Sequence, residues 1–201
     1  MINDHLIEGD KVTSMRIVAG SHRGRRIHSP PGISIRPTPD RVRESIFNTL
    51  CHGNNRIGRK DRVEGAIVLD GFCGTGAMAL EGLSRGAEFA TCIDINSRAL
   101  EFCRRNAEAL NFLNKMEFLS GNCLYPDKAK KTYSLIFLDP PYYQDLVAPA
   151  LSAFKSKGWI TTGTICTVET GSEEKPKWPP YTEIIEQRKF GKTLITFLII
   201  C

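Results

Sequence analysis

The chain has 201 residues and a mass of 22.4 kDa, the usual size of one domain. Its composition, 41% hydrophobic and 24% charged, excludes a collagen-like, low-complexity or largely disordered chain. The longest apolar run, 194–200, is far shorter than the roughly 20 residues of a membrane-spanning helix, and residues 1–12 lack the basic start and apolar stretch of a secretory signal. We therefore expect a cytoplasmic protein with no membrane partner.

The net charge of +5 is unevenly distributed. Residues 15–62 hold 11 Lys and Arg against three Asp and Glu, a net charge of +8, which leaves −3 for the rest of the chain. Ten of the eleven basic residues are Arg, whose planar guanidinium suits phosphate and base contacts. A solvated charged face is the plainer interpretation, but the asymmetry favours a nucleic-acid partner. The expected contact residues are Arg23, Arg25, Arg26, Arg36, Arg41 and Arg43.

The first part of the chain divides into a tail and a basic arm. Residues 1–14 have no regular pattern, and residues 15–35 carry short apolar pieces separated by Gly and Pro, which predicts one or two small β-hairpins. A helix is expected from Pro39 to about Leu50, with Thr38 as its N-cap and apolar residues at a spacing of four. We therefore divide the chain into a tail (1–14), a basic arm with its helix (15–62) and a core (63–201).

Strands and helices then alternate along the core. Apolar runs predict strands at 66–69, 89–93, 116–119, 135–138, 165–168, 184–189 and 193–200, the last two joined as an antiparallel hairpin. Helices are expected up to Arg85, along residues 100–110, and from an N-cap at Asp145 to Gly158. Alternation of this kind indicates an α/β fold with a mostly parallel sheet covered by helices on both faces. Ligands of such sheets bind at the carboxyl ends of the strands.

A glycine-rich loop follows the first core strand. It spans the residues Asp70, Gly71, Phe72, Cys73, Gly74, Thr75 and Gly76. Glycines let the backbone approach a ligand without a Cβ collision, although a pair of glycines is weak evidence alone. A carboxylate before the loop would repel a pyrophosphate and suits a cationic ligand such as S-adenosylmethionine (SAM). The alternative role for Asp70 is to cap the next helix.

The next two strand ends carry further candidate cofactor residues. Asp94, followed by Ile95, is placed to accept hydrogen bonds from ribose hydroxyls, which both SAM and NAD would offer. Asn122 and Cys123 offer an amide and a backbone N–H at the depth of an adenine edge, although a plain turn explains them equally well.

The fourth strand end carries Asp139, Pro140, Pro141 and Tyr142. The prolines fix the backbone, so the Asp139 carboxylate and the Pro140 carbonyl can both accept hydrogen bonds from one exocyclic NH₂ group. Such a pair favours the charge that builds on the nitrogen during methyl transfer. Tyr142 would stack on the nucleobase that carries this amine, after the base has left its stack in the nucleic acid. The alternative is a rigid turn with a core tyrosine.

The seven cysteines contain no C-x-x-C pair, and His22 and His28 have no metal-binding neighbours in the sequence. We therefore expect small buried cysteines in a reducing compartment and no metal site.

The sequence resembles a known family at several places in order. Asp139 to Tyr142 together with the glycine loop is the motif pair of SAM-dependent amino-methyltransferases. The stretches 15–20, 36–48 and 74–87 look specifically like the RsmD family, which methylates N2 of a guanine in small-subunit (16S) ribosomal RNA. The resemblance covers residues 15–200. Gly71 and Cys73 depart from the expected bulkier apolar residue and Ala, and the loop 171–181 is divergent.

The resemblance implies a seven-stranded Rossmann-like methyltransferase core, with SAM as the methyl donor and the basic arm as the RNA-docking element. It also implies that residues 70–76, Asp94 and Asn122 contact SAM and that Asp139 to Tyr142 hold the guanine. We expect a monomer that acts on 16S rRNA or on the assembling small subunit. Three alternatives remain open: an amino-methyltransferase of DNA adenine or cytosine, a catalytically inactive RNA-binding module, and, more distantly, an NAD-dependent oxidoreductase.

Overall fold

The structure is a computed structural model that describes residues 15–30, 38–53 and 61–201. The predictions for the tail 1–14, for Arg36 as an RNA contact and for the start of the 36–48 stretch therefore fall outside the described residues. No described helix combines the length and the hydropathy needed to cross a membrane.

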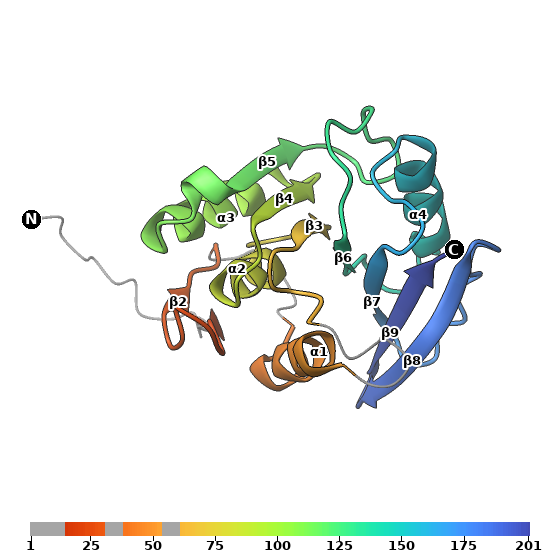
Figure 1. Cartoon of the computed structure of the whole chain (residues 1–201), viewed down its shortest axis with the longest axis horizontal. Helices are drawn as coiled ribbons and strands as arrows, with labels where there is room; N and C mark the ends of the chain where they lie inside the picture. Colours follow the sequence, from red (N-terminus) through yellow and green to blue (C-terminus); the bar gives the residue numbers. More distant parts are fainter. Residues whose placement is uncertain (1–14, 31–37, 54–60) are drawn as a thin grey trace, which may run out of the picture.

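A seven-stranded sheet runs through the whole molecule (Figure 1). Its strands are β3 (Ile67–Gly71), β4 (Phe89–Asp94), β5 (Met116–Ser120), β6 (Leu135–Leu138), β7 (Ile165–Gly171), β8 (Thr182–Phe190) and β9 (Thr193–Ile200). They lie side by side in the order β5-β4-β3-β6-β7-β9-β8, and only β9 is antiparallel to its two neighbours. All seven strands predicted from the core sequence are present. The Rossmann-like fold class is thus confirmed by the strand order, which reverses between β3 and β6.

Helices cover both faces of the sheet. Neighbouring residues of a strand point to opposite faces, so apolar residues along one strand pack against helices on both sides. Four helices carry this packing: α1 (Asp40–His52), α2 (Ala77–Ser84), α3 (Ser97–Ala109) and α4 (Val147–Ser156). Val68 of β3 packs in one core with residues of α1, α2 and α3, whereas its neighbour Leu69 packs in a second core with residues of α4. A 3-10 turn, Leu113–Lys115, precedes β5.

The basic arm is packed against the core. Its strands β1 (Met15–Arg16) and β2 (Arg26–Ile27) form a short antiparallel hairpin beside α2 (Figure 1), so one predicted hairpin is confirmed. Ile17 and Ile27 are buried in the same core as α2 and α3. The backbone near Gly20 lies so close to α2 that a Cβ there would stand 1.9 Å from the Ser84 carbonyl oxygen.

Two predicted helix caps are wrong. The cap residue of α1 is Pro39 and no side chain caps the helix, because the Thr38 hydroxyl donates instead to Glu169 Oε2 at 3.3 Å. The cap residue of α4 is Leu146, since Asp145 lies one residue too early and adopts a left-handed conformation with φ of 52°.

Candidate active site

The candidate cofactor and catalytic residues meet at the carboxyl ends of neighbouring strands in the middle of the sheet. β3 lies between β4 and β6, and all three strands are parallel. Gly71 is in register with Ile93 of β4 and with Leu138 of β6. Asp94 and Asp139 therefore flank the start of the glycine loop, as the strand-end rule predicts.

Within the glycine loop, the part that follows β3, residues 72–76, is fixed by hydrogen bonds to the end of β4. Asp94 Oδ2 accepts the Gly74 N–H at 2.7 Å, and the Cys73 N–H donates to the Ile93 carbonyl at 3.1 Å. Gly74 and Gly76 have φ of 53° and 80°, which favour glycine, while Phe72 adopts the less common left-handed conformation at 60°. A carboxylate has about four acceptor sites, so Asp94 keeps acceptor capacity for a ligand after bonding Gly74 and Asn96.

Asp70 lies beneath the loop and is 3% exposed. Its Oδ2 accepts the Ala79 N–H of the first turn of α2 at 3.0 Å, so the helix-capping role considered for it is present. Burial raises the pKa of this carboxyl well above its usual range, and the charges of Asp139 and Asp94 add to the rise. A cationic ligand beside the loop would favour its ionised form.

The remaining cofactor candidates line the same region. Ile95 is 74% exposed directly after Asp94 and offers an apolar surface for a flat ring. The Asn122 side chain accepts the Leu124 N–H at 2.9 Å, the geometry of a local turn. Cys123 is buried behind Gly71, and burial raises its pKa to about 12, so its side chain serves packing.

The tetrapeptide 139–142 leaves β6 beside the glycine loop. The Asp139 N–H points to the Gly71 carbonyl at 3.5 Å. The Tyr142 hydroxyl donates to Glu169 Oε1 at 2.7 Å and lies 3.0 Å from Thr193 Oγ1. Burial raises the pKa of Tyr142, so the hydroxyl stays protonated. These contacts fix one end of the ring that the sequence predicts to stack on a base.

Two residues of this region carry no sequence signal. Glu169, on β7, is 6% exposed and lines a small pocket together with Asp139 and Thr38. Tyr143 is 68% exposed with φ of 59°, and its ring lies edge-on to that of Tyr142 at 6.3 Å between centroids. Glu169 follows the predicted strand 165–168 without any motif around it, and the sheet order brings it to Asp139.

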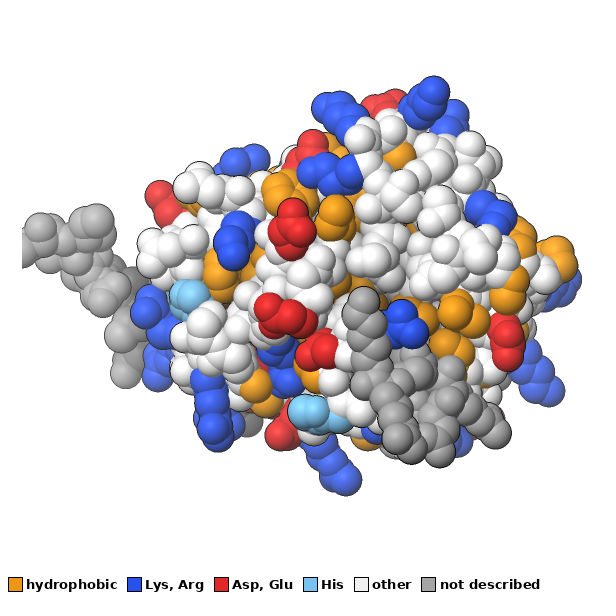
Figure 2. All heavy atoms as spheres, in the orientation of Figure 1, with side chains coloured by type: hydrophobic (Ala, Val, Ile, Leu, Met, Phe, Trp, Pro, Cys, Tyr) orange, Lys and Arg blue, Asp and Glu red, His pale blue; other side chains and the backbone are white. Residues whose placement is uncertain are grey.

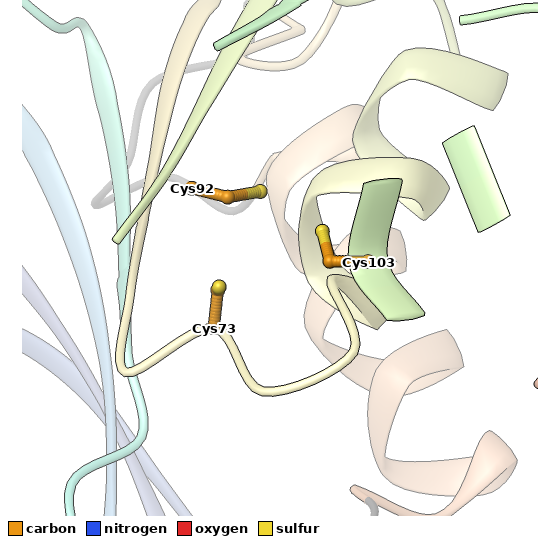
Figure 3. Close-up of side chains that lie close together, drawn as sticks. All are labelled: Cys73, Cys92 and Cys103. Atoms are coloured by element: carbon orange, nitrogen blue, oxygen red, sulfur yellow. The ribbon is translucent and has the colours of Figure 1, made fainter. Parts of the chain in front are cut away.

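Three buried cysteines meet beneath the glycine loop (Figure 3). Cys73 of the loop, Cys92 of β4 and Cys103 of α3 place their sulfur atoms within 4.8 Å of one another, close enough for one soft metal ion. The hydrogen bond between Cys73 and Cys103 raises the pKa of Cys73 well above its usual range and lowers that of Cys103. The expectation of no metal, which rested on sequence spacing, did not anticipate this cluster and stays a prediction.

The arginines of the arm separate into two groups. Arg23, Arg25, Arg26 and Arg41 are exposed, and Figure 2 shows basic side chains gathered at the lower left, where Figure 1 places the hairpin. Arg43 is fully buried, and its guanidinium donates to the carbonyls of Thr38 and Arg16 and to Asp40 Oδ1. The expectation that Arg43 contacts RNA is therefore wrong: it joins the hairpin to α1.

The family model described as "Conserved hypothetical protein 95" matches residues 15–199. The chain is also 30% identical over 159 residues to Ribosomal RNA small subunit methyltransferase D of Escherichia coli strain K12, covering 79% of this chain and 76% of that protein. The chain belongs to the RsmD family. Another protein of the same name, from Buchnera aphidicola subsp. Acyrthosiphon pisum, is 28% identical to this chain, and the match covers 95% of each protein.

Solved methyltransferase structures share the fold of this chain. The Escherichia coli protein yhhF superimposes with a TM-score of 0.78 at 27% identity, over 93% of this chain and 98% of that one. An RNA methyltransferase from Salinibacter ruber, solved with S-adenosyl-L-homocysteine, has a TM-score of 0.63 over 82% and 94% of the two chains; at 14% identity it shows the fold alone. The chain is thus an RsmD-family methyltransferase with a Rossmann-like core.

Proposed function

We propose that this protein transfers the methyl group of SAM to the exocyclic N2 of a guanine in 16S rRNA. The observation that carries the proposal is the position of Asp139. It follows the residue of β6 that is in register with Gly71, so an acceptor for the target amine lies at the start of the cofactor loop. The names of the RsmD relatives support the small-subunit rRNA as substrate.

The residues present fit SAM. Asp94 has acceptor capacity for the ribose hydroxyls, Ile95 offers its exposed apolar side chain to the adenine, and Asp70 supplies a buried carboxyl toward the positive charge. The main chain of residues 72–76 and of 122–123 completes the proposed cofactor site. Bound SAM supplies an activated methyl group on a positively charged sulfur.

The tetrapeptide aligns the nucleophile. The Asp139 carboxylate and the Pro140 carbonyl accept the two amine hydrogens of guanine, which favours positive charge on the nitrogen as it bonds to carbon. Asp139 can take the proton after transfer, and because a carboxylate is a weak base, loss of the proton to water serves equally. Pro141 fixes the turn, and the Tyr142 ring, held by Glu169 and Thr193, stacks on the extruded base.

The test is the variant Asp139→Ala, with Asp139→Asn as the isosteric form and Asp127→Asn, at an exposed acid, as the control. Methyl transfer is followed on small subunits, naked rRNA and duplex DNA, with mass spectrometry of the product nucleosides. We expect N2-methylguanosine in RNA, at least about a 100-fold loss of rate for Asp139→Ala, and unchanged SAM affinity by calorimetry.

Other outcomes would contradict the proposal. A tenfold loss of SAM affinity in Asp139→Ala would make Asp139 a cofactor residue. Methylation of DNA adenine or cytosine by the wild type would favour the DNA enzyme, and absence of transfer to any RNA would favour an inactive binding module.

A further inference from the structure

Tyr143, the residue after the tetrapeptide, is exposed and yet fixed in position. It is 68% exposed, and its φ of 59° lies in the left-handed region that bulky residues seldom adopt. Such conformations gather at active sites and ligand clamps. The hydroxyl end of the ring lies against the end of β7, because a Cβ on Gly171 would stand 2.9 Å from Tyr143 Oη and 3.0 Å from Cζ. The ring is therefore held at one end while most of the residue is open to solvent.

The rings of Tyr142 and Tyr143 are nearly perpendicular. Their planes meet at 83°, with 6.3 Å between the centroids. Bases in a continuous stack are parallel, whereas bases that lie on two perpendicular rings are turned away from each other. A base that enters an active-site pocket leaves its stack, so the next nucleotide loses a stacking partner. The two rings thus offer separate supports to an extruded base and to its neighbour in the RNA.

A pocket beside Tyr143 has room for this neighbouring base. Its volume is about 290 Å³, and it lies between residues 145–149 at the start of α4 and residues 174–177 after β7. The Glu174 carboxylate would stand 2.9 Å from the same added Cβ as the Tyr143 hydroxyl, so the pocket adjoins the ring. Val, Ala and Pro side chains give the pocket apolar walls, which suit the flat faces of a base. The carboxylates of Asp145 and Glu174 would repel a phosphate, so the base and not the backbone belongs in this pocket.

We propose that Tyr143 stacks on the nucleotide next to the target guanine and that the base of this nucleotide enters the pocket between α4 and residues 174–177. The inference rests on the proposed function. Recognition of single-stranded RNA commonly uses splayed bases that stack on aromatic side chains. Every base has an aromatic face, so this contact holds the RNA open for extrusion without requiring one particular neighbour.

The experiment is a double-mutant cycle between Tyr143→Leu and an abasic nucleotide beside the target guanosine. The 5′ and the 3′ neighbours are replaced separately by splinted ligation of the rRNA, which is assembled into subunits if the wild-type reaction requires them. Stacking of a base on an aromatic side chain contributes a factor of about 5 to 150. We expect Tyr143→Leu to lower kcat/KM at least about fivefold on intact RNA, but by less than about twofold on the RNA that lacks the stacked base. The abasic nucleotide on the other side should leave the effect of Tyr143→Leu unchanged.

Two further variants separate stacking from other effects. Tyr143→Phe keeps the ring and should stay within about twofold of the wild type on every RNA. Tyr125, which is 82% exposed after β5, is the matched control, and Tyr125→Leu should also stay within about twofold. SAM affinity by calorimetry and thermal unfolding of each variant, measured in parallel, should match the wild type.

The proposal is overturned if Tyr143→Leu causes the same loss on intact RNA and on both abasic RNAs, because the ring would then act on the tetrapeptide and not on a neighbouring base. It is also overturned if Tyr143→Leu changes kcat/KM by less than about twofold on intact RNA. Failure of the wild type to methylate unmodified rRNA would contradict the proposed function itself, and this inference with it.

Discussion

One buried carboxylate makes a large contribution to the attachment of the arm to the core. Glu81 of α2 is 0% exposed and accepts the N–H groups of Val18 at 2.7 Å and Ala19 at 3.0 Å. It also pairs with Arg85 Nε at 2.7 Å, where the Arg85 side chain is only 9% exposed. The change Glu81→Ala would leave two backbone donors and a guanidinium without their acceptor.

The cost can be worked from these contacts. Each buried donor left unsatisfied costs about 1–3 kcal/mol, and breaking a buried ion pair costs about 3–5 kcal/mol. Because the three contacts share one carboxylate, the costs overlap, and we expect a total of about 3–5 kcal/mol. Met15, Ile17 and Ile27 are buried and each contribute about 1.5–3 kcal/mol to docking. The hairpin should therefore open locally more often while the sheet stays folded.

Hydrogen exchange of the Val18 and Ala19 amides measures this opening directly. Protection should fall by a factor of about 100 or more in Glu81→Ala, since about 1.4 kcal/mol is tenfold. Protection should fall less in Glu81→Gln, which keeps one acceptor. The control Glu101→Ala removes the exposed pair with Arg105 and should cost under about 1 kcal/mol. Protection within threefold of the wild type in Glu81→Ala would refute the reasoning.

Three further predictions concern RNA docking, the buried acid and the cofactor loop. Removing three exposed arm charges should weaken RNA binding and reduce the slope of log binding constant against log salt concentration by about 2, at about 0.7 per single-strand phosphate contact. A salt titration compares this arm variant with a control variant that lacks three distant lysines. An unchanged slope in the arm variant would place the docking surface elsewhere. The two sets are Arg23, Arg25 and Arg26 against Lys128, Lys130 and Lys157. The pKa of Asp70 is raised in the folded state, so its contribution to stability is complete below the unfolded pKa and is lost as pH rises through the folded pKa. In urea unfolding, Asp70→Asn should therefore gain stability relative to the wild type as pH rises through that window. A stability difference that does not change with pH would contradict this. Gly76→Ala should lower the free energy of unfolding by more than about 2 kcal/mol, because φ is 80° and the new Cβ would stand 2.3 Å from Cys103 Sγ. Adding Cys103→Ala should recover part of this loss. No recovery would show that the sulfur atom is not the obstacle.

The sheet and the glycine loop could be predicted from the sequence because their signals are local. The central parallel strands are buried on both faces and appear as short continuous apolar runs, as in Leu135–Leu138. The loop residues stand between such a run and a helix, and the rule that ligands bind at strand carboxyl ends then places Asp70, Asp94 and Asp139 together. The register of β3 with β4 and β6 agrees with that placement.

Apart from the Asp145 cap, which is displaced by one residue, the errors and omissions discussed below involve partners that are distant in sequence. Arg43 is on a polar helix position, but its acceptors include the Arg16 carbonyl 27 residues away, so the arginine is buried. Thr38 fits an N-cap locally, yet its hydroxyl meets Glu169 across 131 residues. The three clustered cysteines come from a loop, a strand and a helix, so no spacing rule could group them.

The contacts of the arm also connect the proposed docking surface to both halves of the proposed site. Asn106 of α3, 1% exposed, accepts the His28 N–H at 2.9 Å and donates to the carbonyls of His28 and, at 3.3 Å, of Thr75 in the glycine loop. On the other side, Thr38 donates to Glu169, which holds Tyr142. The arm thus bonds to the framework of the cofactor loop and of the base pocket. Because catalysis depends on positioning to within about an ångström, loosening the arm should lower the rate of methyl transfer on RNA already bound as well as the affinity for RNA.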